Sequence, residues 1–443
     1  MSDCIIRFSG NNCNNNSAIN ELVEYLNSQC SSKFLVLSSI HSIYKLLSDS
    51  IINAFEQESE HSPIEKSLTD IFLKITGDDP NQEYQVLAER ITNLLHGISL
   101  IGDYSPALKD QVLSYSEKLS AHILQYQLQR LGLQTCIILP EDYKFIVSTD
   151  YGNASHLSFD IDKLKQLNKD LIYIIPGSYG ITSEQKIARA GNSAADYTAA
   201  SITASLSASE LILWGLEKDF FSSDPEIVEN PIIIERLTYA EASELAYFDH
   251  YSFHPRTVEP LEEKHIPIKI KNIDSKSVST IINTETFISE QIIKGVAYSD
   301  DISLLKLNGP GVGLKPGILA KVTTSLSEAE INVKSVITSQ ISINFILGRN
   351  EGMKALEIIN QLGFTSVNKI KIIDDVSLIG IVGHGMQQNY GVSAKLFTAV
   401  AENKINVLLS GSGASDLVSY LIVKQSDRNK SIQKIYQAFF NNR

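Results

Sequence analysis

The residues LIYII at 171–175 and LILW at 211–214 give the clearest indication of the fold. Both runs are apolar or aromatic at every position, which is typical of strands buried on both faces of a parallel sheet. Similar runs stand at 4–8, 34–39 and 135–139. Because longer helical stretches alternate with these runs, we expect the first two-thirds of the chain to form an open, mostly parallel α/β sheet sandwiched by helices.

A long helix-rich insertion separates the second and third of these strands, from about residue 42 to residue 131. Its amphipathic stretch SPALKDQVLSYSEKLSAHILQYQLQRLG ends in Gly132, a residue suited to the position just after a helix. A further strand is expected at 266–270. The polar segment at about 272–295 then reads as a linker.

An internal repeat follows the linker. The segments GILAKVTTSLSEAEINV at 317–333 and GVSAKLFTAVAENKINV at 391–407 lie 74 residues apart and match at eight of seventeen positions. In each copy a strand precedes a loop, an amphipathic helix and two more strands. Two such small units cannot cover their sheets alone, so they should pack on each other or on a partner chain. A duplicated structural module without a ligand fits the same pattern.

Composition and charge exclude several classes of protein. With 38 basic and 51 acidic residues, the formal charge is −13, which leaves too few cations for the phosphate neutralisation that nucleic-acid binding requires. No apolar run reaches about 18 residues, and the N-terminus lacks a signal segment, so we expect a soluble, cytoplasmic protein without nucleic-acid or membrane partners. The four cysteines (Cys4, Cys13, Cys30 and Cys136) lack metal-binding spacing, so neither a metal site nor a disulfide framework is expected.

The stretch from 214 to 272 carries the most specific motifs. It contains Asp-Pro at 224–225, LTYAEASELAYF at 237–248, His-Pro at 254–255 and IPIKIKN at 266–272. In this order the motifs resemble the aspartokinase family in its monofunctional form. In that family an amino-acid-kinase domain is followed by two ACT domains, which are small folds that bind regulatory amino acids.

The resemblance covers essentially the whole chain and implies an architecture. The α/β fold would combine the amino-acid-kinase sheet with two ferredoxin-like ACT domains of ββαβ type. The implied domains are a kinase domain at 1–290, a first ACT domain at 296–373 and a second at 374–443. The ACT pair further implies a homodimer or a larger assembly and a small amino acid as substrate or effector.

The implied activity is ATP-dependent phosphorylation of the side-chain carboxylate of L-aspartate, the first step toward lysine, threonine and methionine. ATP and Mg²⁺ would be the cofactors. The alternative is a catalytically inactive homologue, a pseudokinase, that acts as an amino-acid-binding or regulatory dimer. Altered residues within the motifs keep both interpretations open.

Phosphoryl transfer to a carboxylate needs cations and backbone N–H groups that hold two anions in line. The family's K-F-G-G-[TS]-S corresponds to RFSGNN at 7–12, so the resemblance assigns a phosphate-binding role to Arg7 and Gly10. A guanidinium is a planar fork and not a compact ammonium, which alters the contact. Asp196, in the retained DYTAA run, would lie near the metal and the transferring phosphoryl group, or would merely start a helix. The implied catalytic residues are Arg7, Glu117 and Asp196.

The resemblance also implies a binding site for the substrate, with contacts from Ser38, Ser39, Tyr44, Glu117 and Asn192. Tyr44 stands where the family has threonine and should crowd the substrate carboxylate. Glu117 would contact the substrate ammonium, although by itself it would be an exposed acid on an amphipathic helix. Asn192 replaces the arginine that should clamp the carboxylate, and Arg189 could substitute only if the loop takes another route.

The implied nucleotide-binding residues are Arg7, Gly10, Phe221, Asp224, Pro225 and Tyr251. Phe221 could stack on adenine in place of the family's tyrosine, whereas the turn at 224–225 would shape its loop with or without a nucleotide. Tyr251 replaces a lysine that would face the ATP phosphates. The loss of one such cation commonly costs several kcal/mol of transition-state stabilisation, which favours the inactive alternative.

An effector site is expected around the Gly-rich loop GPGVGLKPG at 309–317, whose N–H groups could receive a carboxylate. The residues assigned to it are Gly313, Pro316, Gly317, Ile318, Asn332, Ser339 and Gln340. Lysine-responsive members of the family carry acids on the strand where this chain has Lys334 and Gln340, so lysine feedback is not favoured. The alternative is a turn that serves only packing between ACT domains.

Overall fold

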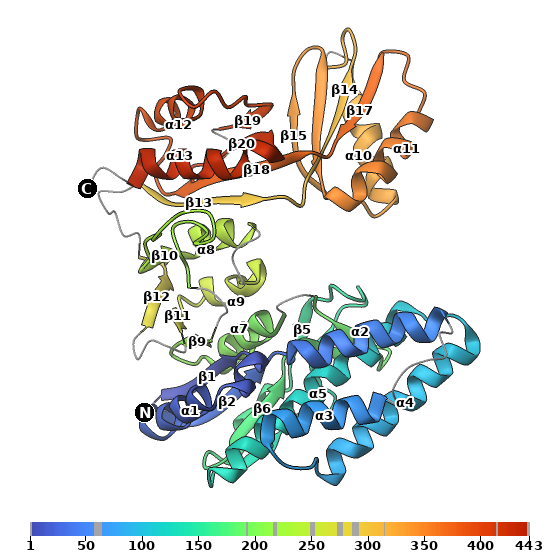
Figure 1. The fold of residues 1–443 in the computed structure, drawn as a ribbon, viewed down its shortest axis with the longest axis vertical. Helices are drawn as coiled ribbons and strands as arrows, with labels where there is room; N and C mark the ends of the chain where they lie inside the picture. The colour runs from blue at the N-terminus through green and yellow to red at the C-terminus, as the bar shows by residue number, and fades with distance from the viewer. Residues whose placement is uncertain are drawn as a thin grey trace. The chain divides into compact units, whose positions relative to one another are not determined.

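The computed structural model describes residues 2–56, 64–191, 194–215, 219–248, 253–272, 278–285, 292–313, 315–412 and 415–440. The chain divides into two compact units (Figure 1). The first unit contains Met1–Asp219, Glu235–Tyr239 and Ser252–Glu285. The second contains Phe220–Ile234, Ala240–Tyr251 and Thr286–Arg443. The first unit therefore holds the expected α/β sheet and the second holds the internal repeat.

An eight-stranded sheet in the order β10-β12-β11-β9-β1-β2-β6-β3 forms the centre of the first unit. Its strands are β1 (Ser2–Phe8), β2 (Cys30–Leu37), β3 (Thr135–Ile137), β6 (Ile172–Pro176), β9 (Leu211–Trp214), β10 (Arg236–Thr238), β11 (Ile268–Lys271) and β12 (Val278–Asn283). Every neighbouring pair is parallel except β11 and β12. Every residue of β6 and β9 is buried, which confirms the mostly parallel sheet that their apolar sequences predict.

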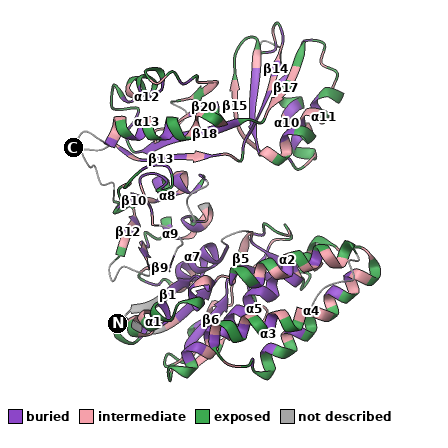
Figure 2. Cartoon of the chain, in the orientation of Figure 1, coloured by how far each residue is buried: buried purple, intermediate pink, exposed green. Residues whose placement is uncertain are grey.

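Helices cover this sheet and also form the long insertion. The helices of the first unit are α1 (Asn16–Gln29), α2 (His41–Glu56), α3 (Ile64–Thr76), α4 (Gln82–Ile101), α5 (Pro106–Arg130), α6 (Ile161–Lys165), α7 (Ala194–Leu206) and α9 (Glu259–Glu262). Helices α2 to α5 lie between β2 and β3 in the chain. Ser105 caps α5 by accepting a hydrogen bond from Leu108 N, and Gly132 follows the helix with a φ of 80°. Helix α5 and strand β6 are buried along most of their lengths (Figure 2).

A smaller four-stranded sheet in the first unit has the order β5-β4-β7-β8. Its strands are β4 (Ile146–Val147), β5 (His156–Ser158), β7 (Tyr179–Ile181) and β8 (Ile187–Arg189). Strands of two or three residues are too short to give a periodic apolar pattern, so the sequence did not predict this sheet. It matters for the site because β8 ends at Arg189.

The second unit contains two small domains, each with a four-stranded antiparallel sheet and two helices. The first small domain comprises β14 (Ser303–Asn308), α10 (Ile318–Glu328), β15 (Val333–Thr338), β16 (Ser342–Leu347), α11 (Gly352–Gln361) and β17 (Lys369–Ile373). The second comprises β13 (Ile293–Ser299), β18 (Val376–Gly383), α12 (Val392–Ala401), β19 (Leu409–Gly411), β20 (Val418–Lys424) and α13 (Arg428–Phe440). Their hydrophobic cores are separate.

The repeat found in the sequence is also present in the structure. Gly317 and Gly391, which match in the repeat, occupy the N-cap positions of α10 and α12 with φ angles of 90° and 92°. Both angles lie in the left-handed region, which glycine enters without strain. One feature departs from the expected boundaries, because β13 precedes the first small domain in sequence but pairs with β18 of the second. The first small domain is thus inserted into the second.

The segment Phe220–Ile234 folds with the second small domain and not with the large sheet. Val296 N donates a hydrogen bond to Ser222 O at 2.8 Å, and the hydroxyls of Ser222 and Tyr436 lie 3.0 Å apart. Gln433 donates to Ile227 O at 2.9 Å. These contacts attach to the second unit a segment that the resemblance placed in the kinase domain.

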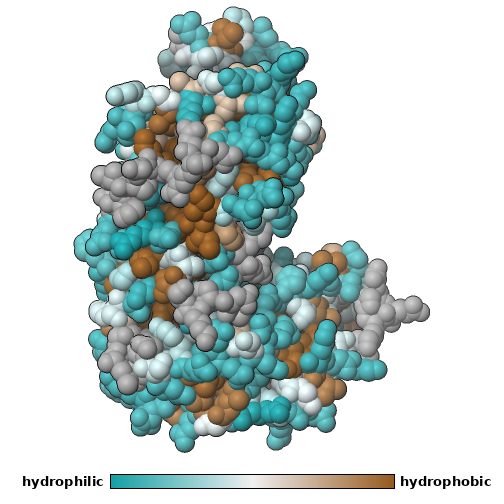
Figure 3. All heavy atoms as spheres, turned by 60° about the vertical axis from the view of Figure 1, so that its left-hand side comes forward, coloured by the Kyte–Doolittle hydropathy of each residue, from teal (hydrophilic) through white to brown (hydrophobic). Residues whose placement is uncertain are grey.

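Helix α8 (Tyr239–Ala246) begins at the last residue of a first-unit segment and continues into the second unit. Among the described residues, none of the helices combines the length and the apolar character that crossing a membrane requires. Figure 3 shows one face of the molecule, on which hydrophilic residues predominate and hydrophobic residues appear in smaller patches.

Candidate active site

Arg7 and Asp196 form a buried ion pair at the end of β1 and the beginning of α7. Arg7 Nε lies 2.5 Å from Asp196 Oδ1, and the two residues are only 6% and 0% exposed. Burial raises the pKa of the Asp196 carboxyl, whereas Arg7 and the backbone N–H of His254 favour its charged form. The structure thus brings together two of the three residues predicted to be catalytic.

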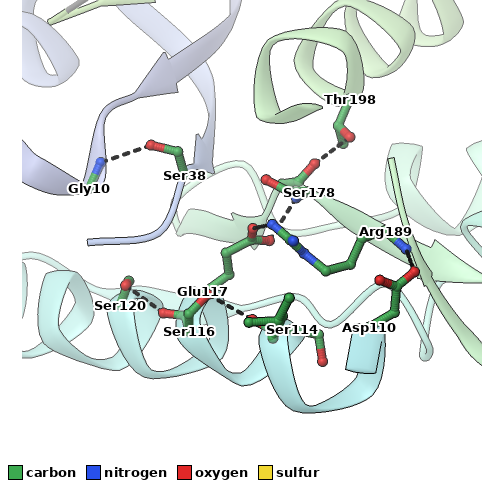
Figure 4. Close-up of polar contacts among 12 residues, drawn as sticks. Gly10, Ser38, Asp110, Ser114, Ser116, Glu117, Ser120, Ser178, Arg189 and Thr198 are labelled. Atoms are coloured by element: carbon green, nitrogen blue, oxygen red, sulfur yellow. Dashed lines mark hydrogen bonds and ion pairs between the residues drawn. The ribbon is translucent and has the colours of Figure 1, made fainter. Parts of the chain in front are cut away.

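Gly10 lies where the chain leaving β1 passes the chain leaving β2. Its N–H donates to Ser38 Oγ at 3.1 Å (Figure 4). A Cβ atom at this position would stand 2.3 Å from Ser38 O, so only glycine permits the close approach. The structure therefore joins one residue of the predicted nucleotide site to one of the predicted substrate site.

Glu117 is fully buried on α5. Its Oε2 accepts a hydrogen bond from Ser178 N at 2.7 Å, and its Oε1 lies 3.9 Å from Arg189 Nη2. Burial raises the pKa of the Glu117 carboxyl, and Arg189 and Ser178 partly oppose that rise. The interpretation of Glu117 as an exposed acid on an amphipathic helix is therefore wrong, because the opposite face of α5 is covered as well.

Arg189 ends β8 and is only 7% exposed. Its guanidinium carbon lies 5.1 Å from the centre of the Tyr44 ring on α2, an arrangement typical of a cation–π contact. Its backbone N–H donates to Asp110 Oδ2 at 2.8 Å, and Gly152 N donates to the same oxygen at 2.7 Å. The main chain of Arg189 is thus fixed by a buried carboxylate, while its side chain faces Tyr44 and Glu117.

Sequence reasoning missed Asp110, whose carboxyl pKa is raised by burial. A signal was available, because Asp110 and Glu117 stand seven residues apart in a helix and therefore lie on the same face two turns apart. Two acids on one face of a buried helix indicate a polar site. Figure 4 shows both acids projecting from α5 toward Arg189.

The hydroxyl of Ser120 on α5 holds the chain that follows β2. Ile40 N donates to Ser120 Oγ at 2.9 Å, and that hydroxyl donates to Ser116 O at 2.6 Å. This contact anchors the partly buried Ser38 and Ser39 to α5. Three of the predicted substrate residues, Ser38, Ser39 and Tyr44, are therefore carried by the segment that runs from β2 into α2.

The beginning of α7 is fixed against the end of β6. Thr198 Oγ1 donates to Gly177 O, and a Cβ atom on Gly177 would stand 2.7 Å from Ala195 Cβ. The Tyr197 ring contacts the rings of both His156 and His254, with centroid distances of 4.8 and 5.9 Å.

Both histidines beside Tyr197 are held in their neutral forms. Burial, with the neighbouring charge of Arg256, lowers the pKa of His156 to about 3 and that of His254 to about 4. The Arg256 guanidinium lies 4.8 Å from the centre of the Tyr197 ring, so it faces the same stack. This aromatic stack supports the first turn of α7, which carries Asp196.

The structure does not describe the remaining predicted substrate and nucleotide residues as part of this site, for two reasons. Asn192 and Tyr251 lie outside the described residues. Phe221, Asp224 and Pro225 belong to the second unit, where Tyr298 OH donates to Asp224 Oδ2 at 3.2 Å. Asp224 also accepts a hydrogen bond from Glu226 N, as expected for a residue that shapes its loop.

The predicted effector residues lie in the first small domain. Gly313 N donates to Gln340 O at 3.1 Å, and a Cβ atom on Gly313 would stand 2.1 Å from Ser339 O, so the loop and the facing turn are in contact. Gly317 caps α10 and Ile318 is buried, whereas Pro316 and Asn332 are exposed. In the described part of the chain, no three His, Cys, Asp or Glu side chains are grouped to hold a metal ion.

Family models match most of the chain. A model of the amino acid kinase family matches residues 5–272, and an ACT domain model matches 305–362 and 379–439. An α/β kinase-type domain joined to a pair of ACT domains is therefore the class of protein that the fold and the site define. The chain belongs to the amino acid kinase family.

Its curated relatives are aspartokinases. The bifunctional aspartokinase/homoserine dehydrogenase of Buchnera aphidicola is 26% identical over 421 residues, which cover 90% of this chain and 51% of that protein. Aspartokinase 2 of Bacillus subtilis is 26% identical over 337 residues, which cover 74% and 82%. The chain thus spans about half the length of the bifunctional relatives.

Solved structures share the fold. The structure of E. coli aspartokinase III in complex with aspartate and ADP has a TM-score of 0.83 at 22% identity and covers 99% of this chain and 100% of that one. The aspartate kinase of Clostridium acetobutylicum has a TM-score of 0.72 at 20% identity and covers 98% and 99%. These comparisons confirm the expected fold class and the two ACT domains.

Proposed function

We propose that this protein is an aspartokinase that transfers the γ-phosphoryl group of ATP to the side-chain carboxylate of L-aspartate. The observation that carries the proposal is the pairing of each buried motif acid with a buried arginine. Asp196 pairs with Arg7, and Glu117 lies beside Arg189. Relatives with this activity in their names, matched over most of the chain, support the proposal.

The residues of the chain would act by positioning and by charge neutralisation, which is most of what phosphoryl transfer requires. Asp196 fixes the guanidinium of Arg7 through Nε, and Arg7 Nη1 has no hydrogen-bond partner among the described residues. That nitrogen is therefore free to donate to a phosphoryl oxygen. The close turn at Gly10 would let backbone N–H groups approach the phosphates.

ATP and Mg²⁺ would be the cofactors. A buried arginine beside a glycine turn fits a phosphate chain, and Asp196 Oδ1 lacks a well-formed hydrogen bond. Since the described residues offer no cluster of three metal ligands, the phosphates would supply most of the oxygens around Mg²⁺. When bound, Mg²⁺ neutralises charge on the transferring phosphoryl group.

Regulation and assembly are part of the same proposal. The ACT pair would bind a small amino acid through the loop that holds Gly313 against Ser339, and would join two or more chains in the cytoplasm. Lys334 Nζ lies 3.0 Å from Asp301 Oδ2 and brings a cation to the strand where lysine-responsive proteins carry acids. The effector is therefore proposed to be an amino acid other than lysine.

A second candidate function is that of a pseudokinase that binds amino acids or regulates a partner. The observation that favours it is that both arginines of the site are already paired with carboxylates of the same chain. Removing one partner of a buried ion pair destabilises a fold. The two pairs could therefore be retained for the stability of the fold alone, without any catalytic role.

Trapping of the acyl phosphate separates the two candidates. Purified full-length protein is incubated with ATP, Mg²⁺ and L-aspartate, hydroxylamine converts any acyl phosphate to a hydroxamate, and other amino acids serve as acceptor controls. We expect aspartate-dependent hydroxamate, reduced by about 100-fold or more in Asp196→Asn. The matched variant Asp78→Asn, on the exposed ion pair with Arg130, should keep full activity. Folded protein that forms no hydroxamate with any acceptor would favour the pseudokinase.

A further inference from the structure

A cavity of about 600 Å³ lies in the first unit, outside the candidate active site. The ends of three helices line it, namely the first turns of α1, the last turn of α3 and the last turn of α5. Its volume falls within the roughly 300–1,000 Å³ of pockets that hold small molecules. None of the residues that line it is among those that the resemblance assigns to a substrate, a nucleotide or an effector.

The cavity has a surplus of positive charge. Lys74 and Arg130 line it, and no acidic side chain of the described chain does. Lys74 has no ion pair or hydrogen bond within the described ranges. Arg130 uses one nitrogen, Nη1, for its contacts with Thr76 O at 2.8 Å and Asp78 Oδ2 at 2.7 Å, which leaves Nε and Nη2 for a ligand. Asp78 offsets part of this charge without lining the cavity, so the net charge favours an anion.

Gln127 adds a buried polar group that lacks a partner. This residue lines the cavity and is only 8% exposed. Its Nε2 donates to Cys13 O at 2.8 Å, whereas its Oε1 has no hydrogen-bond partner in the described part of the chain. Because an unsatisfied amide oxygen is costly to bury, a ligand that donates an O–H or N–H group to Oε1 would be stabilising.

The rest of the lining narrows the ligand further. Asn16 and Asn20 stand four residues apart on α1 and place two more amides at the cavity. Amides both donate and accept hydrogen bonds, as hydroxyl groups do. Ile19, Ile75 and Leu131 supply apolar surface for a carbon skeleton. Since none of the described lining residues is aromatic, a stacked base is not expected.

We propose that this cavity binds a small organic anion that carries hydroxyl groups, either a phosphate ester or a carboxylate. Lys74 and Arg130 would hold the anionic group, and Gln127 Oε1 would accept a hydrogen bond from a hydroxyl group. The inference goes beyond the proposed kinase function and does not depend on it, because the cavity contains no residue of the candidate active site.

Gln127 also connects the cavity to the chain that leaves β1. Cys13, whose carbonyl it holds, belongs to the short 3-10 helix Gly10–Asn14. A ligand that fixes the Gln127 amide would therefore stabilise this short helix. Slower hydrogen exchange of its backbone amides would report that the cavity is filled.

Calorimetric titration of the full-length protein tests the binding. Glucose 6-phosphate and gluconate provide the two sources of negative charge, and glucose is the neutral counterpart. We expect at least one anion to bind about tenfold or more tightly than glucose, and the comparison of the two decides between phosphate and carboxylate. Lys74→Met and Arg130→Met should each weaken that binding by about tenfold. Gln127→Met should abolish the slower exchange of residues 10–14 that the anion causes.

Two controls locate the binding. Lys66→Met removes the same charge from the same helix, but Lys66 is exposed and does not line the cavity, so the affinity for the anion should not change. An excess of ADP with Mg²⁺ should not displace the anion, because the cavity holds none of the proposed nucleotide-binding residues.

The possible outcomes are distinct. Binding of neither anion in preference to glucose would overturn the inference. Preferential binding that persists unchanged in both Lys74→Met and Arg130→Met, or that ADP displaces, would also overturn it, because the anion would then be bound elsewhere. None of these measurements requires hydroxamate formation, so failure of this inference and failure of the proposed function can be told apart.

Discussion

Gly10 keeps two strand ends in contact, and this contact can be tested with one methyl group. In Gly10→Ala the new Cβ would meet Ser38 O and the backbone of Ser39 at 2.3 and 2.6 Å, and backbone atoms cannot swing aside as a side chain can. We expect a loss of stability of about 1–3 kcal/mol and near-complete loss of hydroxamate formation, because the turn that is proposed to approach the phosphates must move. Thermal unfolding and the hydroxamate assay measure the two effects.

Gly97 provides the matched control for this substitution. It lies inside α4, and a Cβ atom there would have no neighbour within 4 Å. Gly97→Ala should stabilise the protein by about 0.5–1 kcal/mol, because alanine favours the helix, and activity should not change. Equal behaviour of the two variants would contradict the importance of the contact at Gly10.

The buried histidines beside Tyr197 predict a dependence of stability on pH. The pKa of His156 is lowered from 6.5 to about 3, so unfolding takes up a proton at this site between about pH 3 and pH 6.5. The contribution of this histidine is thus fully present above pH 6.5 and is lost as the pH falls toward 3. His254 and Arg256 face the same stack, and protonation of His156 would add a third positive charge there.

The substitution His156→Gln tests this dependence. Gln can keep the hydrogen bond to Thr198 but cannot take up the proton, so proton uptake on unfolding between pH 6 and 4.5 should fall by about one. Chemical denaturation across this pH range measures the slope. Asp110, Glu117 and Asp196 have raised pKa values in the folded protein and therefore release protons on unfolding. These carboxyl groups are common to both proteins, so their contribution cancels in the comparison. An unchanged slope would contradict the neutral buried state of His156.

The sequence predicted several residues that the structure brings together in the candidate site, but it did not predict how they are arranged. Arg7 and Asp196 were both predicted to be catalytic from motifs 189 residues apart, yet a motif contains no information on which side chains pair. The burial of Glu117 was not predicted, because α5 is covered on both sides only once the whole insertion has folded. The position of Arg189 depends on a sheet of very short strands, which leaves no pattern in the sequence.

Helix α5 positions the substrate segment through Ser120, which gives a prediction about the helix. Ser120→Ala would leave the buried N–H of Ile40 without an acceptor and should cost about 1–3 kcal/mol of stability. It should also raise the KM for aspartate more than it lowers kcat, since the anchored residues Ser38 and Ser39 belong to the proposed substrate site. Steady-state kinetics of hydroxamate formation would show the difference.

Ser114 is the matched control on the same helix. Its hydroxyl donates to Gln111 O, a local contact within α5. Ser114→Ala should therefore change stability by less than about 1 kcal/mol and leave KM unchanged. A Ser120 variant that behaves like the Ser114 variant would show that the hydroxyl does not anchor the segment after β2.

Strands of the large sheet could be predicted because their sequences are apolar or aromatic at nearly every position. A strand buried on both faces has no polar positions, so β6 and β9 stand out from the chain. Strand β13 shows the limit of such reasoning. Its sequence predicts a strand, but pairing with β18 joins segments separated by a whole domain, and a local pattern does not specify a distant partner.

The connection between the small domains predicts which parts of the chain can be removed. In the β13–β18 pair, Ser299 lies opposite Leu378, so the two ends of the inserted first small domain are close together. We expect that replacing residues 303–373 with a linker of about four Gly and Ser residues leaves the second small domain folded. The separate hydrophobic cores of the two small domains make this removal possible.

Truncation after residue 374 should have the opposite effect, although it removes a similar length of chain. It would leave β13 without β18 and would expose Ile293 and Val296, which pack in one core with Ile227 and Val228. Light scattering and thermal unfolding compare the two shortened proteins. The internally shortened protein should remain monodisperse with a cooperative transition, whereas the truncated protein should aggregate through its exposed core. A truncated protein that stays soluble, beside an internally shortened one that aggregates, would contradict the insertion of one small domain into the other.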